Sequence, residues 1–131
     1  MLPDTPGTSG TGVAVSDRIV LTVPAGARFR SVATLVIGGI GGRANLPYER
    51  MDDLQLAVLS ILDSTDGSAV TLEVDSDDDG LALAVGPVRD GSSHDDGLRL
   101  VLSRLVDGVA HEHRDGAEWI TFGIANAGSA T

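Results

Sequence analysis

The 131-residue sequence contains no cysteine, and this absence removes several classes of chemistry at once. Without thiols the chain has no disulfide bond, no nucleophilic cysteine and no cysteine-ligated zinc site. Only 3% of the residues are aromatic, so an aliphatic core is expected. No apolar run approaches the about 20 residues of a membrane-spanning helix, and the N-terminus lacks the basic and apolar segments of a signal peptide. We therefore expect a cytoplasmic protein without membrane contact.

Basic residues are also scarce. Nine arginines and no lysine stand against 19 acidic residues, which gives a formal net charge of -10. Because nucleic acids and anionic membranes bind basic surfaces, neither is expected as a partner. The length suffices for one domain with a real core. We expect a flexible arm over residues 1–16, a single domain over residues 17–125 and a flexible tail over residues 126–131.

What the chain does have is an unusually apolar segment that runs from Asp52 to Ser64. A helix that is apolar on nearly all sides is typical of a buried position, so this segment predicts a central, covered helix. Its two leading aspartates favour a helix start, and Gly67 is well placed for a left-handed cap. Ser60 and Ser64 are four residues apart and share one face of this helix.

Periodicity on either side of the central helix predicts the other elements. A helix is expected over 27–43, although residues 31–37 could also form a buried strand. A second helix is expected over 97–107, with Leu98, Val101, Leu102 and Leu105 facing the core. Strands are expected over 18–23, 69–74, 81–85, 109–114 and 119–124. The resulting order predicts an α+β two-layer sandwich, in which a mixed, mostly antiparallel sheet is covered on one face by about three helices.

Two local patterns resemble ligand-binding motifs. Residues 39–44 match the dinucleotide fingerprint G-x-G-x-x-A, but Pro47 breaks the long helix that this motif requires, which favours a glycine-rich helix end. Asp75, Asp77 and Asp79 match the start of an EF-hand loop, but the twelfth position is Gly86 instead of glutamate. An acidic turn between two strands is therefore the favoured interpretation.

Histidines offer a further possible site. His111 and His113 would point to the same side of a strand, and two imidazoles can bind a metal. No third ligand is indicated, because His94 is remote in sequence. Solvent-facing histidines on an edge strand are the simpler interpretation, and we expect no metal site.

Three strings, taken in chain order, resemble the RsbW-like anti-sigma-factor family. They are Leu-Thr-Val-Pro-Ala at 21–25, Asp-Leu-Gln-Leu-Ala-Val at 53–58 and the glycine-led helix at 96–107, which a strand, an Asp-Gly turn and another strand follow. The resemblance spans residues 18–124. It implies the ATP-binding fold of histidine kinases and Hsp90 (the Bergerat or GHKL fold), a homodimer, and a sigma factor and/or a STAS-domain anti-anti-sigma factor as bacterial partners.

The positions that carry this family's nucleotide chemistry hold other residues here. The family's central helix has a glutamate base and, four residues later, a magnesium-holding asparagine, which align with Ser60 and Ser64. Serine is neither a carboxylate base nor an adequate replacement for that amide. The adenine-reading aspartate aligns with Ala84, although Gly86 and Pro87 after it match the family. The segment that would form the lid and phosphate loop is short, at residues 89–96, and its Gly-x-Gly motif is reduced to Gly97.

We therefore expect a degenerate nucleotide site with no catalytic residue and no resident cofactor, although backbone contacts could still hold ATP or ADP with Mg²⁺ weakly. The favoured function is an anti-sigma-factor-like regulator of transcription that acts by protein–protein binding. The alternative is an active ATP-dependent serine kinase of the RsbW type that phosphorylates a STAS protein, with Asp63 holding the metal. The remnant nucleotide-binding positions are Ser60, Asp63, Ser64, Gly86, Pro87 and Gly97.

The first predicted helix carries the candidate partner contacts. Arg28, Arg30 and Arg43 lie on it in an otherwise acidic protein, which suggests a surface for a protein partner. The alternative is that these arginines simply solvate the exposed side of the helix.

Overall fold

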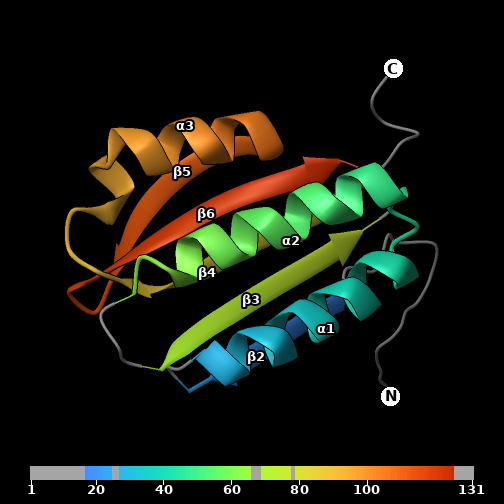
Figure 1. Ribbon diagram of the computed structural model, residues 1–131, viewed down its shortest axis with the longest axis horizontal. Helices are drawn as coiled ribbons and strands as arrows, with labels where there is room; N and C mark the ends of the chain where they lie inside the picture. The colour runs from blue at the N-terminus through green and yellow to red at the C-terminus, as the bar shows by residue number, and fades with distance from the viewer. Residues whose placement is uncertain (1–16, 25–26, 66–68, 78, 126–131) are drawn as a thin grey trace, which may run out of the picture.

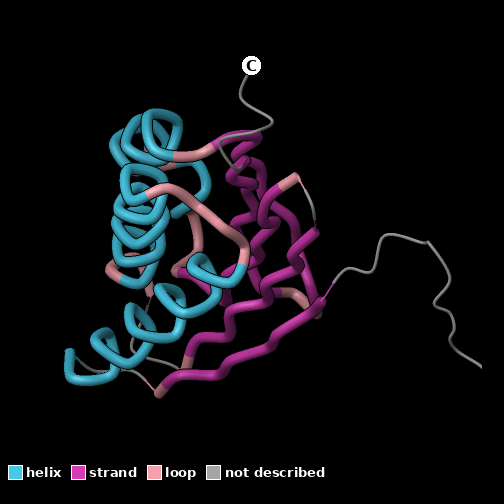
Figure 2. Tube along the Cα trace, turned by 90° about the vertical axis from the view of Figure 1, so that its right-hand side faces the viewer, coloured by secondary structure: helices cyan, strands magenta, loops and turns pink. Residues whose placement is uncertain are grey.

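The protein is described by a computed structural model over residues 17–24, 27–65, 69–77 and 79–125, and these residues form an α+β fold of two layers. One layer is a five-stranded sheet, and three helices all lie on one side of it (Figure 1, Figure 2). The predicted arm (1–16), tail (126–131) and Gly67 cap lie outside the described residues. The two-layer architecture predicted from the sequence is confirmed.

All four strand pairings are antiparallel, so the expectation of a mixed sheet is wrong for the described strands. Helices α1 and α2 lead the chain away from the end of the sheet where β2 finishes and back to it. Strand β3 therefore starts at that end and runs antiparallel to β2. β4 and β5 run the same way, but β6 lies between them in the order β2-β3-β4-β6-β5. The strands are β2 (Asp17–Val23), β3 (Val70–Asp77), β4 (Gly80–Val88), β5 (Asp107–Arg114) and β6 (Ala117–Ala125).

The helices lie side by side, with α2 in the middle (Figure 1). They are α1 (Ala27–Arg43), α2 (Tyr48–Leu62) and α3 (Asp96–Leu105), and a short 3₁₀ turn, η1 (Ser92–His94), precedes α3. The central helix begins at Tyr48, earlier than Asp52, because the extended Pro47 is its N-terminal cap residue and proline is compatible with a helix start.

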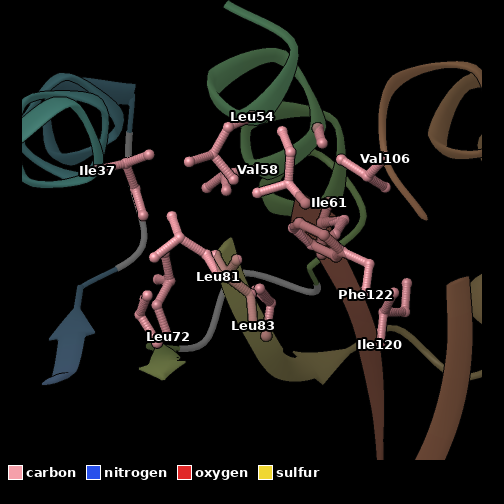
Figure 3. Close-up of a cluster of buried hydrophobic side chains, with 14 of the residues drawn as sticks. Ile37, Leu54, Val58, Ile61, Leu72, Leu81, Leu83, Val106, Ile120 and Phe122 are labelled. Carbon is pink, nitrogen blue, oxygen red and sulfur yellow. The ribbon is translucent and has the colours of Figure 1, made fainter. Parts of the chain in front are cut away.

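The core lies between the sheet and the helices, and Figure 3 shows side chains from both layers meeting there. Alternate residues of β3, β4 and β6 point inward, as the sequence predicts, and pack against Ile37 of α1 and Leu54, Val58 and Ile61 of α2. These sheet residues, each at most 4% exposed, are Val70, Leu72, Val74, Leu81, Leu83, Val85, Ile120, Phe122 and Ile124.

Two burial expectations are wrong. The central helix is not covered on nearly all sides, because Leu56 is 53% exposed on its outer face. Val101 of α3 was expected in the core but is 43% exposed, whereas Leu102 is 1% exposed. Helix α3 lies at the side of the bundle and presents only a narrow stripe to the core, formed by Leu98, Leu102 and Leu105.

The other face of the sheet is lined by paired charges and small residues. Arg18 of β2 forms two hydrogen bonds, of 2.8 and 3.0 Å, with Asp75 of β3. Arg114 of β5 contacts Glu73 of β3 at 2.8 Å and lies 4.3 Å above the ring of Trp119. These contacts cross the sheet from edge to edge and tie the outer strands to the inner ones.

The hairpin of β3 and β4 has the acidic turn that the sequence favours. The Oδ1 atom of Asp77 accepts the backbone N–H groups of Asp79, at 2.8 Å, and of Gly80, at 3.2 Å. Asp75 is held by Arg18 instead. The elements on either side are strands, whereas an EF-hand needs two helices.

Candidate functional site

The C-terminal end of α2 and the turn after it carry Ser60 and Ser64, which the resemblance aligns with a base and a metal ligand. The Ser60 hydroxyl donates to the carbonyl of Leu56 at 2.8 Å, and the Ser64 hydroxyl is 3.5 Å from the carbonyl of Ser60. Both hydroxyls therefore turn back onto their own helix. Neither supplies the carboxylate base or the amide oxygen that the family's aligned positions hold.

The segment after β4 lies directly against this end of α2. The Arg89 backbone N–H donates to the Ser64 carbonyl at 2.8 Å, and the Arg89 guanidinium donates to the Thr65 carbonyl at 3.0 Å. The Ser92 hydroxyl reaches the Ser64 carbonyl at 3.3 Å. Residues 89–92 fall where the resemblance places the lid and phosphate loop. Here they satisfy carbonyl groups at the helix end.

The other remnant positions make contacts of different kinds. Asp63 forms an ion pair with Arg30 of α1 at 2.7 Å. A Cβ atom at Gly86 would lie 2.6 Å from the Trp119 ring on the open face of the sheet, and the half-buried Pro87 follows it in β4. Gly97 lies in the first turn of α3, capped by Asp95. The contacts thus join Ser64 to Ser60 and to residues 89–92, whereas Asp63, Gly86 and Gly97 contact other residues.

A buried carboxylate that the sequence reasoning missed anchors the same segment. Glu118 of β6 is 5% exposed and accepts the backbone N–H groups of Ser93, at 2.6 Å, and Gly91, at 3.1 Å. The Ser93 side chain is the largest cause that lowers the pKa of Glu118 to about 2, and the two N–H groups and His94 add to it against the effect of burial. The available signal was the alternation of β6, which places Glu118 on the inward side with Ile120.

The structure brings together three histidines that are apart in the sequence. The rings of His94 and His111 lie 5.0 Å apart, and those of His111 and His113 lie 6.3 Å apart, measured between centroids. All three side chains are exposed. No set of three or more histidine, aspartate or glutamate side chains within the described ranges is placed to hold a metal ion.

A groove of about 760 Å³ runs between α1 and α2 on the outer surface. On its floor the Gln55 amide donates to the Thr34 carbonyl at 3.2 Å, and beside it Leu35 is 77% exposed. Its small lining residues on α1, Ser31, Thr34 and Gly38, recur at helical spacing, and this pattern in the sequence could have indicated the groove. The lining residues are Arg30, Ser31, Thr34, Leu35, Gly38, Gly39, Gln55 and Leu59.

The glycines of α1 lie within the helix, so residues 39–44 are not the turn of a dinucleotide-binding motif. A Cβ atom at Gly38 would lie 3.1 Å from Gln55 Nε2, and one at Gly41 would lie 2.6 Å from Met51 Sδ. These two glycines admit side chains of α2. In contrast, a Cβ atom at Gly39 or Gly42 would meet nothing within 4 Å.

The three predicted partner contacts of α1 do not form one patch. Arg30 lines the groove and pairs with Asp63. Arg28 is exposed and lies 5.6 Å from the Phe29 ring. Arg43 follows Arg28 by 15 residues, which is about 22 Å along a helix, and borders a separate small hollow with Ile19.

Comparison with known proteins does not assign the chain: no protein-family model matches it, and no curated protein matches it significantly. The resemblance to the RsbW-like family thus stays a prediction. Among the described helices, none combines the length and the apolar character needed to cross a lipid bilayer.

Proposed function

We propose that this protein is an anti-sigma-factor-like regulator that acts by binding a protein partner, with a nucleotide site that has degenerated. The observation that carries the proposal is the closed end of α2, where residues 89–92 donate three hydrogen bonds to the carbonyls of Ser64 and Thr65. The element order from β2 to β6 supports it, because it is the order on which the resemblance rests.

The contacts of the remnant residues weigh against the kinase alternative. Phosphoryl transfer depends on placed charge and metal at the reacting phosphate. Asp63, the residue that could hold magnesium in that alternative, is paired with Arg30 on the α1 side of α2. Residues 89 and 92 contact the carbonyls of Ser64 and Thr65 instead. Binding without turnover is therefore the better supported function.

The outer side of α3 offers a surface for the proposed sigma-factor or STAS partner. Leu100 is 55% exposed and Val101 is 43% exposed, although both are apolar. Arg99 and Arg104 lie on the same short helix. Exposed apolar side chains flanked by arginines are typical of the anchors of protein interfaces.

The first test is calorimetric titration of the purified protein with ATP and with ADP in the presence of Mg²⁺. We expect no binding heat and no change in melting temperature. Micromolar binding would contradict the degenerate nucleotide site. Transfer of labelled phosphate to a STAS protein would establish the kinase alternative.

The second test is binding to the sigma factors and STAS proteins of the native host. We expect one of them to bind, and we expect Leu100→Asp to weaken that binding at least tenfold. The matched control is Leu35→Asp, which changes an equally apolar, exposed residue on α1. If none of these proteins binds, the regulator proposal is wrong.

A further inference from the structure

All three histidines of the chain gather at one edge of the molecule, where η1 meets β5. His94 comes from η1, whereas His111 and His113 come from the edge strand. The centroids of the His94 and His111 rings are 5.0 Å apart, and those of His111 and His113 are 6.3 Å apart. Since all three side chains are exposed, an ion in solution can reach them.

The alternation of β5 directs its two histidines toward the helices. Arg114 lies over the Trp119 ring on the open face of the sheet. His111 and His113 stand three residues and one residue before Arg114, so their side chains lie on the opposite face. That is the face on which the helices lie (Figure 2). Pairing of β5 with β6, in which His111 lies opposite Ile120, fixes the strand.

The histidine of η1 is held as firmly by backbone hydrogen bonds. The His94 backbone N–H donates to the Gly91 carbonyl at 3.0 Å. The Gly91 N–H in turn donates to the buried Glu118 carboxylate at 3.1 Å. The next residue, Asp95, caps α3 by accepting the Leu98 N–H at 2.9 Å. Ligands on a backbone that is already fixed lose little freedom when they bind an ion, and this favours affinity.

The distance between two rings limits whether they can bind the same metal ion. A metal–nitrogen distance of about 2.1 Å puts each imidazole centroid about 3.2 Å from the ion. Two centroids are then about 4.5 Å apart at a right angle and about 6.4 Å apart in a straight line. The 5.0 Å between His94 and His111 corresponds to an angle of about 100° at the ion. The 6.3 Å between His111 and His113 requires the two rings to be almost opposite each other.

The surroundings favour a cation, and the ligand set favours particular ones. The chain has a formal net charge of -10, and the Glu118 carboxylate interacts electrostatically with His94. Imidazole ligands suit Cu²⁺ and Ni²⁺, whose tetragonal geometry places neighbouring ligands at about 90°. Zinc sites use three or four protein ligands. The described ranges place no such set of histidine, aspartate and glutamate side chains for an ion.

We propose that His94 and His111 form a two-imidazole site for a divalent transition-metal ion of the Cu²⁺ and Ni²⁺ class, with water at the remaining positions. The bound ion ties η1 to the edge strand β5. It therefore holds residues 89–95, which cover the end of α2, in the position described above. The proposal does not depend on the function proposed above.

The test is calorimetric titration of the full chain, without an affinity tag, with Ni²⁺. We expect one site with a dissociation constant below about 100 µM. An excess of Ni²⁺ should raise the melting temperature by about 5 °C, because the ion binds the folded state preferentially. Ca²⁺ should do neither, because it prefers oxygen ligands. His94→Ala and His111→Ala should each raise the dissociation constant about tenfold or more and remove the thermal shift.

The matched control is His113→Ala, which removes the same side chain from the same face of β5. It should leave the dissociation constant for Ni²⁺ and the thermal shift unchanged. All three positions are exposed, so the metal-free variants should melt at the temperature of the original chain. The proposal is overturned if Ni²⁺ does not bind below about 1 mM. It is also overturned if His94→Ala binds as tightly as the original chain, or if His113→Ala weakens binding as much as His111→Ala.

Discussion

At the scale of single residues, Glu118 is the buried carboxylate among the described acidic side chains. It is buried beneath residues 91–93 and holds them through two backbone N–H groups. A carboxylate whose charged form accepts such hydrogen bonds has a low pKa, and the pKa of Glu118 is about 2 instead of 4.5. The folded state therefore binds this proton less readily than the unfolded chain does.

The predicted consequence is a pH-dependent loss of stability. The stabilisation from Glu118 is complete above about pH 5 and is lost as the pH falls toward about 2. In Glu118→Gln we expect a lower free energy of unfolding at pH 7 and a flatter dependence on pH across that range. Urea unfolding at a series of pH values measures both. Equal pH dependence in the two proteins would contradict the assignment.

The sequence predicts the sides of β-strand residues well and their polar partners poorly. Alternation alone places Val70, Leu83 and Ile120 in the core, because each strand has one covered face. The partner of Glu118 depends on the path of residues 89–93, which no periodic pattern describes. For the same reason the meeting of His94 with His111 could not be foreseen.

At the scale of elements, α1 contains two kinds of glycine. Gly38 and Gly41 lie against side chains of α2, whereas Gly39 and Gly42 have room for a Cβ atom. Its bounds agree with those predicted from the sequence, since apolar residues recur at helical spacing along it. The sequence pattern predicts the start of α2 too late, because proline ends a preceding helix but is also compatible with the start of the next one. Which side of α3 faces the core could not be predicted, because leucines and valines occur on several of its sides.

We predict different effects for two glycine substitutions in α1. Gly41→Ala should leave the free energy of unfolding within about 1 kcal/mol of its original value, because the flexible end of the Met51 side chain must move away from the added Cβ atom and the cost of that movement offsets the gain in helix propensity. Gly39→Ala should raise it by about 1 kcal/mol, because alanine favours the helix and has room. Denaturant unfolding at low protein concentration measures both. A destabilised Gly39→Ala would mean that the helix packs differently there.

At the scale of the whole molecule, helices cover one face of the sheet, and cross-strand ion pairs line the other. The two layers followed from the order of elements, whereas the all-antiparallel pairing required knowing that β6 inserts between β4 and β5. The candidate nucleotide site could be predicted only as a set of aligned positions. Whether they meet depends on the short segment 89–92, whose contacts the sequence does not specify.

We predict that Arg114 contributes more to the stability of the open face than Arg18 does. Arg114 contacts Glu73 and Glu112 and also lies over the Trp119 ring, whereas Arg18 contacts Asp75 alone and is 60% exposed. We expect Arg114→Ala to lower the free energy of unfolding by about 1 kcal/mol and Arg18→Ala to lower it less. Thermal unfolding of the two variants decides this, and equal effects would contradict it.

Trp119 is the only tryptophan in the chain, and its ring lies against Gly86 beneath the Arg114 guanidinium. Its fluorescence is therefore an optical reporter located entirely on the side of the sheet away from the helices. Its emission should be insensitive to a molecule that docks on α1, α2 or α3 and should change when the strands separate. One native chromophore can thus distinguish, without any label, a ligand that binds from a fold that opens.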